Sequence, residues 1–539
     1  MDFVNPHASM TARRSLLVSF LIAALLLATL CVLFEPVWAT NDDVAMSMIA
    51  HGYGIATYGS PQLVFSNVLW GYFIRALPGI NGILGYTVAT YAILFVIGWI
   101  AMYFLSRLNI GLVQGFLAVS LLLLEPVLFP QFTVNAGLLT VVAVLGWHVY
   151  ARQGGTGNLV AASMLAFVGY LIRYEEFFFV LAIAMPAMPW RALKESRRLK
   201  VSLLVLGAAI TLASLFDHWS YNGAEWQPFK EFNSARLPYT DYGAGEKLKL
   251  HPAIIERHGY TQNDMDLIDY WFFADPKIAD PVSLKSMISE LGTAAVNQDN
   301  LSAGWGAIKV LFNPVWLPLL LGALLLMSIV SGRVLVYCWI LFLAALFVMG
   351  FMGRPGMLRV YVPVLTLLLL IPMTTHKFHL ESRQWMITLL LVLACVGNAV
   401  LNIPYALGAG QKIRLVQHDL QSFPQGPVVI MGGESGFPFE LAYPPFARSP
   451  EARKIKFYRL DTFMFAPYSN ASAEAKAGNG LIESLQEPQG IRIVLSRQQY
   501  QMLQIYCREH YGGRLLVRTV YIGAATAVQQ MRCDKETAR

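Results

Sequence analysis

Residues Ser15–Trp38 read SLLVSFLIAALLLATLCVLFEPVW, and Ala39-Thr40-Asn41-Asp42-Asp43 follows directly. An apolar stretch of this length can cross a bilayer as one helix. Asp42 and Asp43 therefore come just past the end of the first predicted membrane span. Two anionic groups beside the hydrocarbon edge are costly to desolvate and repel each other, which favours a raised proton affinity for one of them. A carboxylate at this depth is placed to act on a molecule whose apolar tail lies in lipid.

The composition indicates an integral membrane protein. Of the 539 residues, 56% are hydrophobic and only 14% are charged, whereas soluble domains carry about 25% charged residues. The net charge of +7 comes from basic residues in short loops between apolar stretches, as the positive-inside rule describes. The basic charge therefore does not indicate a nucleic-acid partner.

The hydropathy pattern predicts a multi-pass α-helical membrane protein with about eleven transmembrane helices, counted in a window of roughly 19 residues. The predicted spans are residues 15–38, 82–105, 109–124, 134–150, 158–172, 177–189, 201–216, 306–330, 334–351, 360–375 and 385–404. Arg13 and Arg14 place the N-terminus in the cytoplasm, and the basic cluster Trp190–Lys200 is the strongest cytoplasmic anchor. Three arginines break the charge rule, since Arg173, Arg354 and Arg359 fall on the outer side.

This register divides the chain into a membrane domain, residues 1–405, and a small extracytoplasmic α/β domain, residues 406–539. The membrane domain includes a first outer loop, 39–81, and a long outer loop, 217–305. Residues 427–431, 492–495 and 514–522 read as strands, while 480–486 and 498–509 read as helices. Cys507 and Cys533 lie in this domain, and the sequence leaves open whether they form a disulfide or two free thiols.

The first outer loop contains two segments with apolar residues at helical spacing, Val44–His51 and Val68–Leu77. They predict two short helices in the membrane interface. In the simplest alternative, the loop is a plain interfacial hairpin, and Asn41-Asp42 only caps its first helix. We expect a catalytic role for at least one of Asp42 and Asp43.

This combination resembles the GT-C superfamily of membrane glycosyltransferases. Members have an acidic residue, often a pair, in the first outer loop, interfacial helices in that loop, and often a soluble domain after the last span. Asp42-Asp43, the segment 44–77 and residues 406–539 match these features. The resemblance implies a polyprenyl-phosphate-sugar donor, an aspartate acting as general base on an acceptor hydroxyl, and inversion at the anomeric carbon. It also implies cationic groups that meet the leaving phosphate.

Four arginines are candidates for that phosphate contact, because the guanidinium fork binds two oxygens. They are Arg173, Arg354, Arg359 and Arg236. Each has a simpler interpretation. Arg173 can pair with Glu175 or Glu176, Arg354 and Arg359 can bind lipid head groups, and Arg236 can be a solvated loop charge.

Further polar residues are predicted to line the substrate cavity. They are Asn41, His51, Glu125, Asn135 and Glu175. His51 is more often a hydrogen-bonded interfacial histidine, and Glu125 a helix-end group. No protein metal site is predicted, although a divalent cation at the aspartate pair stays open.

Other functions fit the same topology. A flippase or transporter of a lipid-linked glycan would show related halves and broken helices at the midplane, which the sequence does not display. The sequence alone poorly distinguishes a glycan polymerase or ligase from a transferase. In a structural assembly subunit the aspartate pair would be incidental. The predicted location is a bacterial inner membrane, with lipid, glycan or protein acceptors and no nucleic acid as partners.

Overall fold

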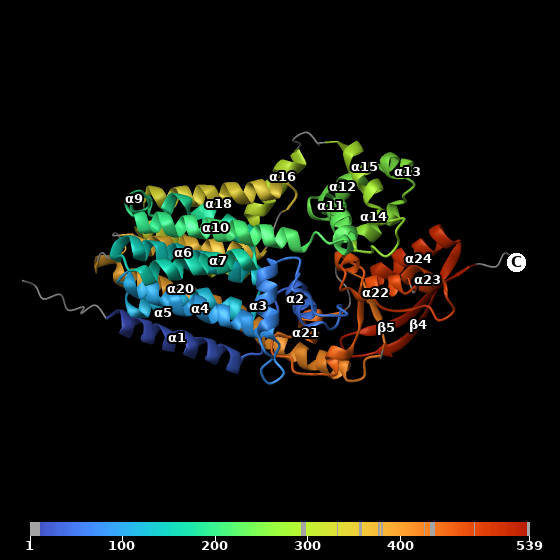
Figure 1. Ribbon diagram of the computed structural model, residues 1–539, viewed down its shortest axis with the longest axis horizontal. Coiled ribbons are helices and arrows are strands. Elements are labelled where there is room, and N and C mark those ends of the chain that lie inside the picture. The colour runs from blue at the N-terminus through green and yellow to red at the C-terminus, as the bar shows by residue number, and fades with distance from the viewer. Residues whose placement is uncertain are drawn as a thin grey trace, which may run out of the picture.

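The computed structural model describes residues 11–292, 298–330, 332–354, 358–375, 378, 381–424, 426–431, 437–478 and 480–535. Long apolar helices lie side by side at one end of the molecule, and a sheet with shorter helices lies at the other (Figure 1). The bundle consists of α1 (Ala12–Leu33), α4 (Gly85–Arg107), α5 (Leu112–Leu128), α6 (Phe132–Gln153), α7 (Thr156–Ile172), α8 (Tyr174–Ala184), α10 (Arg197–Ser220), α17 (Leu317–Val330), α18 (Arg333–Phe351), α19 (Leu358–Leu370) and α20 (Glu381–Leu420). The short helix α9 (Trp190–Glu195) connects α8 to α10.

The bundle is that of an integral membrane protein. Among the residues that the structure describes, six helices are long and apolar enough to cross a membrane, and a seventh span results if the bent pair Asp299–Phe312 and Pro314–Val330 counts as one. Shorter apolar helices occur at Leu112–Leu128, Thr156–Ile172 and Arg359–Thr374. Each of the eleven predicted stretches overlaps at least one helix, but the number of eleven crossings stays a prediction.

Two of the predicted stretches differ from the helices that the structure contains. The stretch 306–330 is not one straight helix, because α16 (Gln298–Lys309) and α17 meet at a 48° bend. The helix that contains the last predicted span continues well past residue 404, since α20 has 40 residues and is about 60 Å long at the usual helical rise. The last turns of α20 are polar, so a hydropathy window does not recognise them as part of a helix. In the structure they are helical and extend beyond the bundle.

The two predicted helices of the first outer loop are present as α2 (Asn41–His51) and α3 (Val68–Ala76). Asn41-Asp42 is not the cap of α2, because Thr40 occupies the N-cap position and both aspartates lie in the first turn. Negative charge is favoured there by the helix dipole. Gly52 ends α2 with φ of 69°, and a Cβ at this position would lie 2.5 Å from the Gly59 nitrogen. Only glycine satisfies both constraints.

The other end of the molecule, which we call the head region, contains a five-stranded sheet of order β2-β1-β3-β5-β4. Its strands are β1 (Val428–Ile430), β2 (Phe457–Arg459), β3 (Ile491–Val494), β4 (Gly513–Ile522) and β5 (Ala527–Lys535). The pairs β1–β2 and β1–β3 are parallel, whereas β5 is antiparallel to β3 and β4. The strands β1, β3 and β4 were predicted from the sequence, and the predicted mixture of strands and helices is present. The strands β2 and β5 were not predicted.

The head region also includes the long segment between α10 and α16. Its helices are α11 (Gln227–Asp241), α12 (Ala244–Lys249), α13 (Pro252–Arg257), α14 (Gln262–Asp269) and α15 (Pro281–Leu291), and the C-terminal helices are α21 (Phe439–Ala442), α22 (Asn470–Lys476), α23 (Leu481–Gln486) and α24 (Arg497–Tyr511). Tyr239 and Phe273 share one buried core with Ile493 and Tyr506. The Phe273 N–H also donates to the carbonyl of Leu460 at 3.0 Å. The part of the predicted outer loop 217–305 from α11 to α15 is therefore a folded half of the head region.

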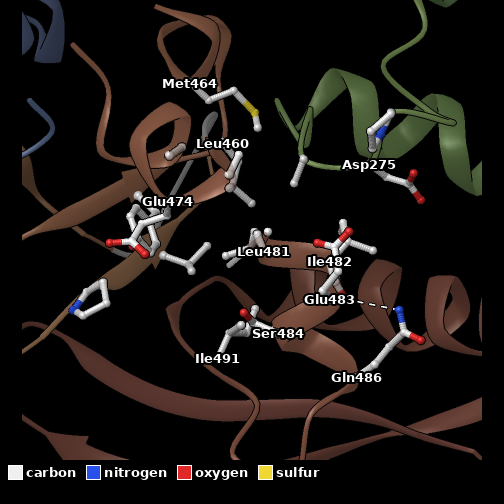
Figure 2. A pocket seen from close by; sticks show the side chains of 18 of the residues that line it. Asp275, Leu460, Met464, Glu474, Leu481, Ile482, Glu483, Ser484, Gln486 and Ile491 are labelled. Atoms are coloured by element: carbon white, nitrogen blue, oxygen red, sulfur yellow. Dashed lines mark hydrogen bonds between the residues drawn. The ribbon is translucent and has the colours of Figure 1, made fainter. Parts of the chain in front are cut away.

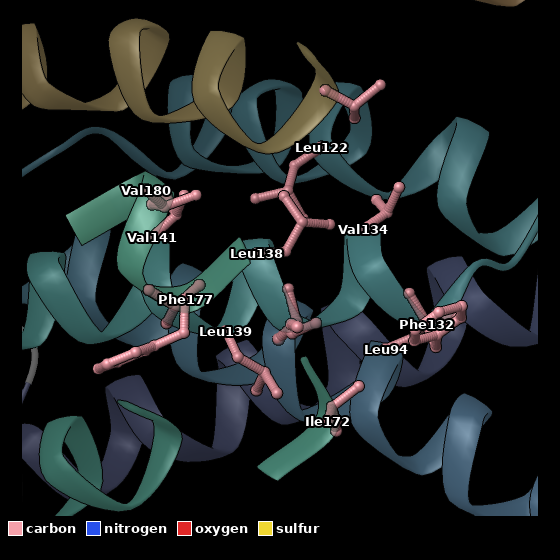
Figure 3. Close-up of a cluster of buried hydrophobic side chains, with 14 of the residues drawn as sticks. Leu94, Leu122, Phe132, Val134, Leu138, Leu139, Val141, Ile172, Phe177 and Val180 are labelled. Carbon is pink, nitrogen blue, oxygen red and sulfur yellow. The ribbon is translucent and has the colours of Figure 1, made fainter. Parts of the chain in front are cut away.

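Helix α6 lies at the centre of the bundle. Eighteen of its residues are buried, which is typical of a helix that is apolar all round and covered on every side. Figure 3 shows Leu138 and Leu139 of α6 among Leu94, Leu122 and Phe177 from neighbouring helices. This packing fixes the first residue of α6, Phe132, whose backbone N–H takes part in the candidate site.

Cys507 of α24 and Cys533 of β5 form a disulfide with a Cα–Cα distance of 5.5 Å and a sequence separation of 26. A loop of this length predicts a stabilisation of about 3 kcal/mol. The double variant Cys507→Ala/Cys533→Ala should therefore melt at a lower temperature in detergent, as measured by differential scanning fluorimetry. The control Cys395→Ala, in α20, removes a cysteine that forms no disulfide. This control should not lower the melting temperature of the head region as the double variant does. Maleimide labelling of both cysteines without reductant would contradict the bond.

Candidate active site at the first turn of α2

The link between α1 and α2 is held on both sides. The Val37 N–H donates to the carbonyl of Leu128 at 3.1 Å, and the Ala39 N–H donates to that of Pro130 at 3.2 Å. Trp38 Nε1 donates to the carbonyl of Tyr443 at 3.0 Å. The first turn of α2 is thus fixed between the end of α5 and the head region.

Asp43 is completely buried. Its Oδ1 accepts hydrogen bonds from the Tyr86 hydroxyl at 2.9 Å and the Phe132 N–H at 3.1 Å, and its Oδ2 accepts from the Thr40 hydroxyl at 3.1 Å. Burial raises the pKa of Asp43 to about 8, and the charge of Asp42 adds to this rise, although the hydrogen bonds oppose it. Asp43 is therefore closed off from solvent, and its hydrogen bonds tie the first turn of α2 to α4 and α6.

Asp42 is turned to a different side of the same helix, because consecutive residues of an α-helix point about 100° apart. Its side chain is 24% exposed, and its Oδ2 lies 3.1 Å from Nη1 of Arg359. Arg359 belongs to the first turn of α19, more than 300 positions away in the sequence. Asp42 is thus the member of the pair that a substrate can approach.

Arg173 lies next to this ion pair, between α7 and α8. Its Nη1 donates to the Phe65 carbonyl at 2.9 Å, and its Nε is 3.0 Å from Oε2 of Glu175. The guanidinium lies over the rings of Phe65 and Phe132, at 5.7 Å from each centroid. Asp42 and Arg359 both act on Arg173 electrostatically. Two neighbouring guanidiniums repel each other, so an anion with several oxygens would be stabilised between them.

A cavity of about 310 Å³ adjoins Arg359. Its polar lining is Thr40, Glu125, Gln131 and Arg359, and its apolar lining is Ala39, Val134, Val315, Trp316 and Val362. These residues come from the link before α2, from α5 and α6, from the turn Pro314–Trp316 and from α19. The cavity therefore joins an arginine to an apolar space within the bundle.

The other predicted cavity residues are spread around the site. Asn41 is half-buried in the first turn of α2, Asn135 is buried one turn into α6, and Glu175 is 46% exposed beside Arg173. His51 lies at the opposite end of α2, where its Nε2 accepts from the Tyr86 N–H at 3.1 Å. Burial lowers the pKa of His51 to about 4. His51 is thus a neutral group that supports Tyr86, and its predicted place in the substrate cavity stays a prediction.

Arg236 and Arg354 belong to a second ionic cluster. Arg236 is buried and its Nη1 lies 2.9 Å from Oδ1 of Asp241, while Nη2 of Arg354 lies 3.2 Å from Oδ2 of the same residue. The simpler interpretation of Arg236 as a solvated charge was wrong, because α11 folds into the core of the head region. Asp241 pairs with both guanidiniums in this second cluster. Of the four predicted arginines, Arg173 and Arg359 are therefore the two that the structure brings to Asp42.

Three charged residues near the site were missed. Glu176 of α8 is buried and interacts electrostatically with Arg359 and Arg173. Glu440 of α21 interacts with Asp42 and with Arg459 of β2, and burial raises the pKa of Glu440. In the sequence, Glu176 was indicated only weakly, as the neighbour of Glu175. Nothing in the sequence indicated Glu440 or Arg459, because only the folding of the head region brings these two residues to this part of the molecule.

The fold and the site define an integral membrane protein with a carboxylate–arginine site where its helices meet a folded head region. No protein-family model and no curated protein matches the chain. Among solved structures, the chain is similar to the crystal structure of ArnT from Cupriavidus metallidurans bound to undecaprenyl phosphate, at 12% identity and a TM-score of 0.38. The similarity covers 95% of this chain and 97% of that chain. At this TM-score it assigns no residue its role.

The buried carboxyl of Asp43 predicts a pH-dependent stability. Its pKa is about 8 in the folded protein and about 4 in an unfolded chain. Between these values the folded state holds a proton that the unfolded state has released, so stability falls as pH rises toward 8. The melting temperature in detergent should drop by about 2 °C from pH 6 to pH 8.5.

The variant Asp43→Asn should keep the fold and lose most of this drop, because the amide stays neutral and its oxygen still accepts from Tyr86 and Phe132. The matched variant Glu175→Gln should keep the wild-type slope. An Asp43→Asn protein with an unchanged slope would contradict the assignment.

Proposed function

We propose that this protein transfers a sugar from a polyprenyl-phosphate donor to an acceptor hydroxyl at the membrane surface that faces the head region. The proposal rests on one observation. The Asp42 carboxylate lies 3.1 Å from Arg359, and Arg359 lines a cavity between the bundle helices. An acid that can take a proton, a cation that can meet a phosphate and an apolar space for a lipid tail are thus adjacent.

Donor binding uses the arginines and the cavity. The phosphate lies against Arg359 and Arg173, whose guanidiniums hold its oxygens. The first isoprene units enter the space lined by Val134, Trp316 and Val362, where they are removed from water. The phosphate displaces Asp42 from Arg359, which frees the carboxylate for the acceptor.

The transfer is a single displacement. Asp42 takes the proton of an acceptor hydroxyl, and the oxygen forms a bond to the anomeric carbon. The bond from that carbon to the phosphate oxygen breaks, and polyprenyl phosphate leaves with the electron pair. Arg359 and Arg173 stabilise its added negative charge. Attack from the face opposite the leaving group inverts the anomeric carbon.

The position of the charged residues favours a reaction at the membrane surface over transport across the membrane. The charged residues around Asp42 gather at the end of the bundle that meets the head region, whereas a transporter places its site near the midplane. A polymerase or ligase would use the same groups with a larger acceptor, and it stays the second candidate. The disulfide between Cys507 and Cys533 favours an oxidising compartment for the head region, as on the outer side of a bacterial inner membrane.

Asp42→Asn should remove general-base catalysis and lower turnover by about 10²–10⁴-fold. The assay follows release of free polyprenyl phosphate from lipid-linked sugars, which are extracted from cells that lack this protein. Glu256→Gln, an exposed acid-to-amide change in α13, is the matched control and should leave turnover unchanged. Wild-type turnover by a folded Asp42→Asn protein would refute the proposed base.

Arg359→Lys should raise the KM for the donor by about tenfold, because lysine keeps the charge and loses the two-pronged contact. Arg359→Ala should raise it further. The exposed Arg257, which pairs with Glu290 in the head region, provides the control Arg257→Lys. If donor KM stayed at the wild-type value in both Arg359 variants, the phosphate would bind elsewhere.

A further inference from the structure

The head region contains a cavity of about 880 Å³ that the proposed reaction does not use. Its walls come from α22, α23 and the segment 274–277, and its floor comes from β1, β2 and β3. The segment 274–277 belongs to the long insertion between α10 and α16, so the cavity lies where the two halves of the head region meet. Cavities of this size at such junctions commonly hold ligands.

The middle of the cavity is apolar. Leu460, Leu481 and Ile482 surround the space in Figure 2, with Met464 and Ile491 next to them. Glu474 lies on one side of this space and Asp275 on the other. A ligand therefore meets apolar side chains at its centre and polar groups at its two ends.

Both ends have the same chemistry, a phenol hydrogen-bonded to a carboxylate. At one end the Tyr458 hydroxyl bonds to Glu474. At the other, Oδ2 of Asp275 accepts from the Tyr506 hydroxyl at 2.7 Å, and that hydroxyl lies 3.2 Å from the hydroxyl of Tyr511. Carboxylates have spare lone pairs that accept from ligand hydroxyls, and a phenol oxygen accepts as well.

The charges of the lining nearly balance. Three carboxylates, Asp275, Glu474 and Glu483, oppose two cations, Lys277 and Arg492. The slight excess of negative charge disfavours a phosphate-rich ligand such as a nucleotide. The ligand that fits is neutral, rich in hydroxyls at its edges and apolar on its faces.

We propose that this cavity is a binding site for a neutral oligosaccharide. The C–H faces of the sugar rings pack on Leu460, Leu481 and Ile482, and the ring hydroxyls donate to Glu474 at one end and to the Tyr511 hydroxyl, beside the buried Asp275, at the other. The helices α22 and α23 lie in the head region, at the end of the molecule away from the long helices (Figure 1). The ligand thus arrives from water rather than from the bilayer, and the site is separate from that of Asp42.

The test uses the full chain in detergent and a panel of neutral tri- to pentasaccharides built from glucose, mannose, galactose or N-acetylglucosamine. Binding is followed by saturation-transfer NMR and calorimetry. At least one member should bind with a dissociation constant below about 1 mM. Ser484→Trp, which fills the cavity, and Glu474→Gln, which removes a carboxylate, should each weaken binding at least tenfold, with melting temperatures showing that both variants fold.

Asp42→Asn should bind the same sugar as the wild type, so this result does not depend on the proposed transferase activity. Glu256→Gln is the surface control and should also bind normally. The proposal is overturned if no panel member binds the wild type at 10 mM, or if binding survives unchanged in folded Ser484→Trp. Binding of uridine diphosphate in this cavity in place of the sugars would also overturn it.

Discussion

The buried carboxyl of Asp43 is the interaction on which the site depends. It receives hydrogen bonds from Tyr86 of α4, from the first N–H of α6 and from Thr40 of the preceding link. A buried carboxyl without partners would cost several kcal/mol, so these three donors hold the first turn of α2 in one position and orientation. His51 extends the same arrangement, because it accepts from the backbone of Tyr86 at the other end of α2.

Two adjacent aspartates consequently acquire opposite properties. Asp43 has no contact with water and holds a proton up to a pH of about 8. Asp42 is partly exposed and paired with Arg359. The proposed reaction requires Asp42 to exchange its cation for a proton and hence to be accessible, whereas the carboxyl of Asp43 holds the helix in place from a buried position. The helical angle between consecutive residues separates the two roles without any further device.

The head region takes part in the site because the chain between α2 and α3 lies against its sheet. The Phe457 N–H of β2 donates to the carbonyl of Gly54 at 3.0 Å, and Asn470 Nδ2 donates to the same carbonyl at 2.7 Å. The same region brings Glu440 to Asp42, and Arg459 interacts with Glu440 there. The same region has its own hydrophobic core, built jointly by the insertion after α10 and the C-terminal strands. It can thus carry a second cavity without disturbing the bundle.

The sequence by itself determined the membrane class, the positions of the apolar helices, the two short helices after α1 and the aspartate pair, since these follow from local hydropathy and helical spacing. It also identified Arg173 and Arg359 as charges that break the inside–outside pattern. Only the tertiary structure decided which aspartate is exposed, that Arg236 and Arg354 pair with Asp241, and that Glu440 approaches Asp42. These outcomes depend on contacts between residues far apart in the chain, where the free energy comes from packing and desolvation that no local pattern records.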